Sequence, residues 1–191
     1  MTQCIGPLPG WVVPAEQQVR DCWWNAHQVA TVAAEDSALG VFVALDWVLR
    51  PAERQTPVTV RSVPPSREFV RGESWAALSV AAGRPEPTGR DWRRLGALPG
   101  PTRATHRVQC CGVWQGLSWL LGVRAEPPIG IPDRDESGAV VPGSEVYCLP
   151  VDRSRPALLA AKRSREEREL DESVRHWEHI RTLADREKPA V

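Results

Sequence analysis

The chain has 191 residues, a formal net charge of zero and a charged fraction of 25 %. A domain of this length buries enough apolar surface to be stable without disulfides or metals. The neutral charge lacks the basic excess that is typical of proteins binding naked nucleic acid.

The fold class that we expect is mainly α with a small β component. Residues 1–150 would form a compact helical domain, built around two similar helix-turn-strand units. Residues 151–191 would form a long, charged, amphipathic C-terminal helix.

The cysteine content and the start of the chain bear on location. There are five cysteines, an odd number, and no basic stretch followed by an apolar run opens the sequence. This predicts reduced thiols and a cytoplasmic protein. No apolar run approaches the roughly 18 residues of a membrane span, so no membrane is expected as a partner.

The first half of the chain begins with a Pro-rich, irregular lead-in over residues 1–14. Residues 15–50 contain no proline, which favours helix. A cap at Asp36 or Ser37 would begin a second helix, or one helix would run through, and Pro51 would end it. The apolar residues of the first part recur at helical spacing: Val19, Trp23, Ala26 and Ala30.

The middle of the chain alternates between short elements and loops. Residues 56–63 alternate in polarity, which predicts a short strand closed by two prolines. A helix is expected around 73–82. Residues 83–101 are rich in Gly and Pro and predict a loop, with one short helical turn at 91–95.

The next helix is expected over residues 103–121, with Thr102 as its cap and Gly122 as its stop. Residues 123–144 predict a loop, and 145–149 a short strand.

The last expected element is a long helix over residues 155–188. Its second half carries a narrow apolar stripe, about the width of a coiled-coil seam. The stripe suits a partner, a second copy, or the core of the same chain. It consists of Leu170, Val174, Trp177 and then Ile180 or Ala184.

A repeat links two of the helices. Residues 40–50 align without a gap on 112–122, and, with a one-residue gap, 57–60 (PVTV) fall on 128–131 (PIGI). The repeated units would span 37–61 and 109–132, and a fainter third match to 114–122 lies at 75–83. The identical pairs are Gly40 and Gly112, Val41 and Val113, Leu45 and Leu117, Trp47 and Trp119, and Leu49 and Leu121.

Two interpretations of the repeat remain open, an internal duplication or a coincidence of two buried helices. Duplication predicts that the two helices pack as a pseudo-symmetric pair and that strands 57–61 and 128–132 pair with each other. Trp47 and Trp119 point away from the apolar stripe of their helices, where each ring would meet another part of the chain or a partner.

No metal, cofactor or phosphate site is expected. Cys110 and Cys111 are adjacent rather than spaced as in zinc sites, and Cys22 and His27 point to different sides of a helix. His176 and His179 would share a helical face but lack further ligands. No dinucleotide or nucleotide-binding loop occurs, and the Glu–His spacing of di-iron bundles is absent.

One pair of residues is the candidate for nucleophilic catalysis. His106 lies four residues before Cys110, so their side chains would meet on one helix, with Cys111 as the alternative nucleophile. Cys110 also lies on the apolar stripe, where cysteine behaves as a small hydrophobe. Burial is the favoured interpretation, and we expect no catalytic residue.

A basic run near the C-terminus is the candidate for binding nucleic acid. Interleaved glutamates partly neutralise it, which favours a solvated helical face over a phosphate-binding one. Its basic residues are Arg153, Arg155, Lys162, Arg163, Arg165 and Arg168.

The function that the sequence favours is that of a non-catalytic interaction or assembly protein. Nine Trp against two Phe and one Tyr suit contact surfaces, and the partner would be a protein or a second copy. The alternatives are an accessory nucleic-acid-binding protein of a mobile element or phage, acting through 153–168, and a small Cys/His enzyme. The expected contact residues are Trp47, Trp119, Leu170, Val174, Trp177 and Ile180.

Overall fold

A computed structural model describes residues 7–83, 88–94, 106–142 and 144, together with residues 168, 171 and 175. Within these residues the protein is mainly helical, and its β structure consists of one isolated bridge between Arg134 and Val140. No helix in the described part is long and apolar enough to cross a membrane.

The chain divides into two units, Met1–Val151 and Asp152–Val191. In the second unit the structure describes three residues, Arg168, Asp171 and Arg175, which are helical and exposed. The remainder of the expected helix 155–188, the expected strand 145–149 and the expected cap Thr102 lie outside the described residues.

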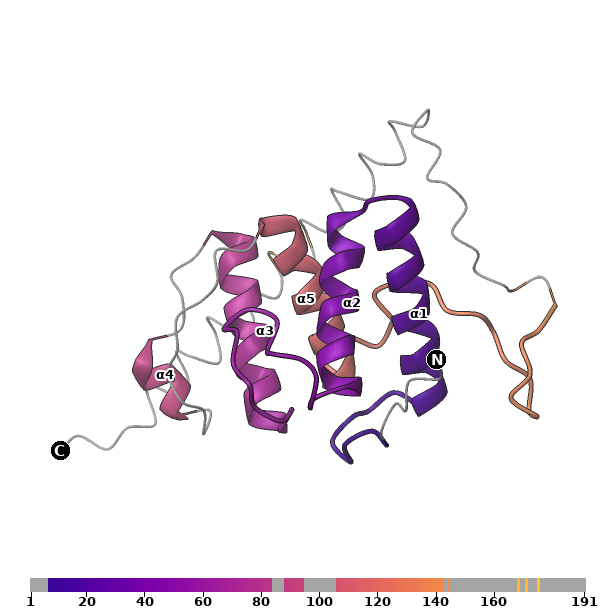
Figure 1. Cartoon of the computed structure of the whole chain (residues 1–191), viewed down its shortest axis with the longest axis horizontal. Helices are drawn as coiled ribbons and strands as arrows, with labels where there is room; N and C mark the ends of the chain where they lie inside the picture. The colour runs from indigo at the N-terminus through magenta and orange to yellow at the C-terminus, as the bar shows by residue number, and fades with distance from the viewer. Residues whose placement is uncertain are drawn as a thin grey trace. The chain divides into compact units, whose positions relative to one another are not determined.

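Five helices make up the described part of the first unit: α1 (Glu16–Val32), α2 (Asp36–Leu49), α3 (Arg67–Ala82), α4 (Gly89–Arg94) and α5 (Arg107–Leu120). Four of them stand side by side in the order α1, α2, α5, α3 (Figure 1). Helices α1 and α2 are antiparallel, as are α3 and α5, whereas α2 and α5 run in the same direction (Figure 1).

The core lies along these four helices. An apolar stripe on each helix is covered by its neighbours, as amphipathic helices require. Large, fully buried apolar side chains come from every one of the four helices: Val19, Val41, Leu45, Trp47, Val70, Leu78, Val113, Leu117 and Leu120.

The break between α1 and α2 falls at Ala33–Glu35. Ala34 adopts a left-handed backbone conformation with φ of 50°, which a helix cannot continue through. Glu35 is the N-cap residue of α2, and its side chain accepts a hydrogen bond from the Ser37 hydroxyl at 2.7 Å. Two helices form here, and the N-cap of the second lies one residue before Asp36 and two before Ser37, the expected caps.

Helix α3 begins six residues earlier than the sequence predicts. Ser66 is its N-cap, and the Ser66 hydroxyl accepts the N–H of Phe69 at 3.3 Å. Helix α5 begins at Arg107 with His106 as its N-cap residue. It ends at Leu120, one residue before the expected end, and Gly122 follows with a φ of 74° that suits glycine in a helix stop.

The two expected strands are wrong. Residues 57–59 form a turn, and 128–132 are irregular. In the first segment, the N–H groups of Val58 and Thr59 bind a buried carboxylate instead of a neighbouring strand. In the second, the prolines 127, 128 and 132 remove backbone donors that a strand ladder needs.

Candidate functional site

The contact between α2 and α5 is made by backbone rather than by long side chains. A Cβ on Gly40 would overlap the Gln109 carbonyl and lie 2.9 Å from the Val113 nitrogen. A Cβ on Gly112 would overlap the Ser37 carbonyl and lie 3.0 Å from the Val41 nitrogen. Only glycine at both positions allows this approach.

These contacts are reciprocal. Gly112 lies 72 positions after Gly40, and the same shift carries Ser37 to Gln109 and Val41 to Val113. Each glycine therefore meets the same two positions on the opposite helix. One turn further on, a Cβ on Gly116 would lie 3.5 Å from the Ala44 Cβ, and these two residues also correspond. We call this contact the α2–α5 seam.

Trp47 and Trp119 are buried inside the unit, with 0 % and 3 % exposure. The Trp47 indole N–H donates to the Val63 carbonyl at 3.1 Å, in the segment that leads into α3. Trp119 lines a hollow of about 300 Å³ together with Val13 and Pro14, in the segment that leads into α1. Trp47 contacts another part of the chain and Trp119 is almost fully covered, so neither ring forms an exposed surface.

Glu73 is fully buried on α3 and organises the loop after α2. Its carboxylate accepts the backbone N–H groups of Val58 at 2.9 Å and Thr59 at 3.1 Å, and it accepts the Thr59 hydroxyl. Burial raises the pKa of Glu73, and the hydrogen bonds from Thr59 and Val58 oppose that rise. The site is a structural clamp, because its carboxylate is enclosed by its own loop.

A second buried polar cluster joins α1, α2 and the following loop. Asp46, 3 % exposed, accepts the Trp23 indole N–H at 3.0 Å and the Arg50 Nε at 2.7 Å. The Arg54 Nε donates to its other oxygen. The Arg50 guanidinium, itself buried, also lies 5.6 Å from the Trp23 ring centroid. Asp46 thereby neutralises a buried cation, a structural task.

The outer surface of the α1–α2 hairpin carries exposed apolar side chains. Trp24 is 55 % exposed and stacks on His27 at 6.1 Å, and the His27 ring lies 5.0 Å from Phe42. Val32 and Leu39 are also exposed. We call the ring cluster of Trp24, His27 and Phe42 the open face.

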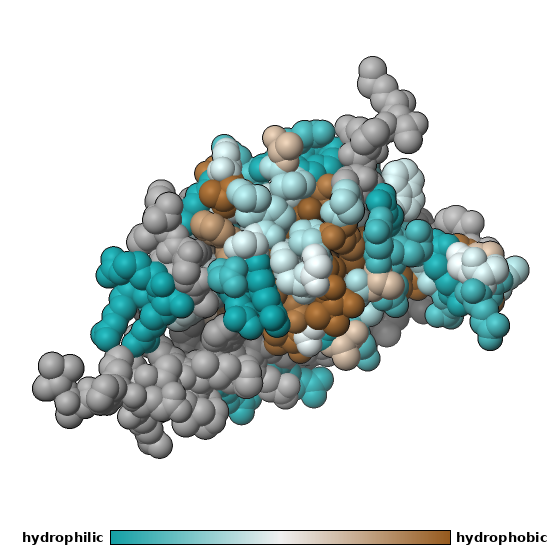
Figure 2. Space-filling model, turned by 90° about the horizontal axis from the view of Figure 1, so that it is seen from below, coloured by the Kyte–Doolittle hydropathy of each residue, from teal (hydrophilic) through white to brown (hydrophobic). Residues whose placement is uncertain are grey.

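The matching positions on α5 are better covered. Phe42 is half-buried, whereas its counterpart Trp114 is 2 % exposed and has the Arg124 guanidinium 5.6 Å from its ring centroid. Leu39 is exposed, whereas its counterpart Cys111 is half-buried. Seen from below, apolar side chains also reach the surface in a band flanked by hydrophilic ones (Figure 2).

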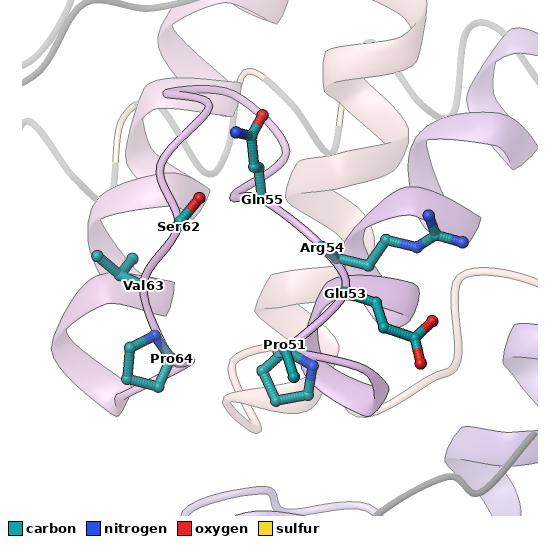
Figure 3. A pocket seen from close by; sticks show the side chains of 8 residues that line it. Pro51, Glu53, Arg54, Gln55, Ser62, Val63 and Pro64 are labelled. Atoms are coloured by element: carbon teal, nitrogen blue, oxygen red, sulfur yellow. The ribbon is translucent and has the colours of Figure 1, made fainter.

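One hollow in the unit has a volume of about 820 Å³ and lies between the two limbs of the loop 51–64. Pro51, Gln55, Val63 and Pro64 are among its lining residues. Figure 3 shows that two charged side chains of the loop, Glu53 and Arg54, point away from the space between the limbs. Both residues still line the hollow at its border, so it is neither purely apolar nor dominated by one charge.

The candidate catalytic pair is not assembled as a nucleophile and base. His106 precedes the first turn of α5, its side chain is 68 % exposed, and its Nδ1 lies 3.7 Å from the Asp36 carboxylate. Cys110 is fully buried beside the seam, and Cys111 is half-buried.

Metal-binding chemistry finds no support in the described residues, which contain no cluster of three or more potential ligands. Burial raises the pKa of the Cys22 thiol to about 12, so the thiolate that a metal needs is strongly disfavoured there.

The two C-terminal candidates lie mostly outside the described residues. Of the six basic residues in the run, the structure describes Arg168, which is exposed and helical. The four stripe residues, Leu170, Val174, Trp177 and Ile180, are not described, and both candidates stay predictions.

Comparisons with known proteins identify no relative. No protein-family model matches the chain, and neither a curated protein nor a solved structure is similar to it.

Proposed function

We propose that this protein is a non-catalytic assembly protein that self-associates through its open face. The observation that carries the proposal is the exposure of Trp24, a large ring left 55 % accessible in a unit that buries Trp47 and Trp119. Exposed Trp residues flanked by other apolar side chains are typical of contact surfaces.

The occupant that we propose is a second copy of this chain. On α5, the position that matches Phe42 is already covered within the chain, with Arg124 stacked on Trp114. A second copy carries exposed arginines on α3, Arg67 and Arg71, that suit the same kind of stacking on Trp24. The proposal therefore needs no partner chemistry beyond what the chain contains.

Light scattering of the full chain over a wide concentration range tests this proposal. We expect a concentration-dependent shift from monomer to a larger species, and Trp24→Ala should return the protein to monomer with unchanged helicity. Val123, which is 64 % exposed and follows α5 rather than belonging to α1 or α2, provides the matched control as Val123→Ala. A monomer at every concentration would refute self-association.

The C-terminal stripe supplies the competing explanation. If Trp177→Ala abolishes association and Trp24→Ala leaves it intact, assembly runs through the tail and the open face is not its site. Of the helix-turn-strand repeat expected from the sequence, the proposal uses only the repeated helix, because neither expected strand is formed.

A further inference from the structure

We infer that residues 7–142 are two fused copies of one helical hairpin unit, and that the α2–α5 seam is a homotypic interface in which each copy is the other's partner. The first copy consists of α1, α2 and the segment after them, and the second of α3, α5 and the segment after them. This inference does not depend on the proposed self-association.

The first helices of the two copies correspond in sequence. Arg67, the first residue of α3, lies 51 positions after Glu16, the first residue of α1. With this shift, six of the sixteen positions from 16 to 31 are identical to those from 67 to 82. The identical pairs are Val19 and Val70, Arg20 and Arg71, Trp24 and Trp75, Ala26 and Ala77, Val29 and Val80, and Ala30 and Ala81.

Burial follows the same correspondence. Val19 and Val70 are both fully buried, and so are Ala26 and Ala77. Residues 75–83, which the sequence matched faintly to 114–122, thus correspond better to 24–32, because α3 occupies in its hairpin the place of α1. A chance likeness of two apolar stripes does not explain the matched exposed-side residues Arg20 and Arg71.

The seam has the contacts that a two-fold axis demands. In a two-fold pair, every contact occurs twice. If a residue of the first copy touches a residue of the second, the equivalent residue of the second copy touches the equivalent residue of the first. Gly40 meets Gln109 and Val113, and Gly112 meets Ser37 and Val41, which are those counterparts. Two helices that pack by coincidence have no reason to share this register.

The segments that leave each hairpin are also held alike. Cys22 on α1 occupies the position of Glu73 on α3, and both side chains are fully buried. Glu73 binds the backbone of Val58, and Cys22 binds the backbone of Ile129, the residue that aligns with Val58. The aligned segments 57–60 and 128–131 are therefore equivalent in position, but the expected strand pairing between them is wrong, because neither segment is a strand.

The tryptophans at the ends of the paired helices complete the pattern. Trp47 of the first copy donates a hydrogen bond to Val63 in the lead-in to the second, and Trp119 of the second copy lines a hollow together with Val13 in the lead-in to the first. The copies differ in the connection between their two helices. Equivalent residues of α1 and α3 are 51 positions apart, whereas equivalent residues of α2 and α5 are 72 positions apart. The second hairpin therefore contains 21 additional residues there.

Exchanging the two seam residues that correspond, Ala44 and Gly116, tests the equivalence in the full chain. Ala44→Gly alone should lower the melting temperature by about 2–4 °C through lost helix propensity. The double exchange, Ala44→Gly with Gly116→Ala, should return it to within about 2 °C of the parent, because a two-fold seam contains the same Ala–Gly pair either way.

Matched glycine variants form the second arm. Gly40→Ala and Gly112→Ala should lower the melting temperature by equal amounts within error. The inference is overturned if one of them is tolerated and the other is not, or if the double exchange melts as low as Ala44→Gly alone. Should both glycine variants fail to fold, the exchange decides, since it changes one methyl group in each helix.

Discussion

The carboxylate of Glu73 accepts the backbone N–H of Val58 at 2.9 Å, across fifteen residues of sequence. Through this bond, a side chain of α3 holds the loop that follows α2 in place. It turns a segment with a strand-like sequence into a clamped turn, because its backbone donors are already used.

Replacing Glu73 tests how much the clamp contributes. Glu73→Ala should destabilise the protein by about 3 kcal/mol or more, because it leaves the buried donors of Val58 and Thr59 without an acceptor. Glu73→Gln retains an acceptor oxygen and should cost less. Denaturant unfolding measures both, with exposed Glu136→Ala as a control that should change stability little. Equal costs for Ala and Gln would contradict the clamp.

The same residue makes stability depend on pH. Burial raises the pKa of Glu73 above its ordinary value of 4.5. A raised pKa in the folded state contributes stability that is complete below the unfolded pKa and is lost as pH rises through the folded pKa. The melting temperature of Glu73→Gln relative to the parent should therefore increase from pH 4 to pH 7. A difference that is constant over this range would show that Glu73 ionises as freely in the folded protein as in the unfolded chain.

Asp46 should be among the least replaceable residues of the first hairpin. Asp46→Asn removes the charge that balances the buried Arg50, a loss of about 3–5 kcal/mol for a broken buried pair. Glu53 offers a matched control, since its carboxylate lies 3.8 Å from Arg50 but its side chain is 58 % exposed. Glu53→Ala should cost less than about 1 kcal/mol. If the two variants unfold at the same denaturant concentration, Asp46 does not have this role.

The Cys22 thiol should be unreactive in the native protein. Its pKa of about 12 leaves almost no thiolate at pH 8, and it is fully buried. Labelling with a disulfide reagent, mapped by mass spectrometry, should modify Cys22 only after denaturant is added. The half-buried Cys111 should react sooner. Rapid native labelling of Cys22 would indicate that α1 opens away from the segment around Ile129.

The helices themselves were largely predictable from the sequence. The absence of proline between 15 and 50, the apolar spacing and the stop at Gly122 are local signals, and α1, α2 and α5 lie where these signals place them. The start of α3 was missed because Ser66 and the polar first turn carry little apolar periodicity. Ser66 two residues after Pro64 is a signal that could have found it.

The tertiary contacts were harder to predict from the sequence. Alternation around Val58 suggests a strand, and only the fold brings Glu73 to that segment. The position of Trp47 and Trp119 off the apolar stripe was evident, but whether each ring meets the chain or a partner depends on where the lead-in segments run. The close approach at Gly40 and Gly112 follows from the repeat only once the two helices are known to touch.

The α2–α5 seam also affects how the two halves of the protein can evolve. In a pair of separate identical subunits, every substitution appears twice, once on each side of the axis. With both hairpins in one polypeptide, a substitution appears once, and the halves are free to diverge. Asp46 and its counterpart Ser118 illustrate this freedom, since one holds a buried arginine and the other lies 3.2 Å from the Ser74 hydroxyl. Fusion thus allows one half to specialise while the other preserves the pairing.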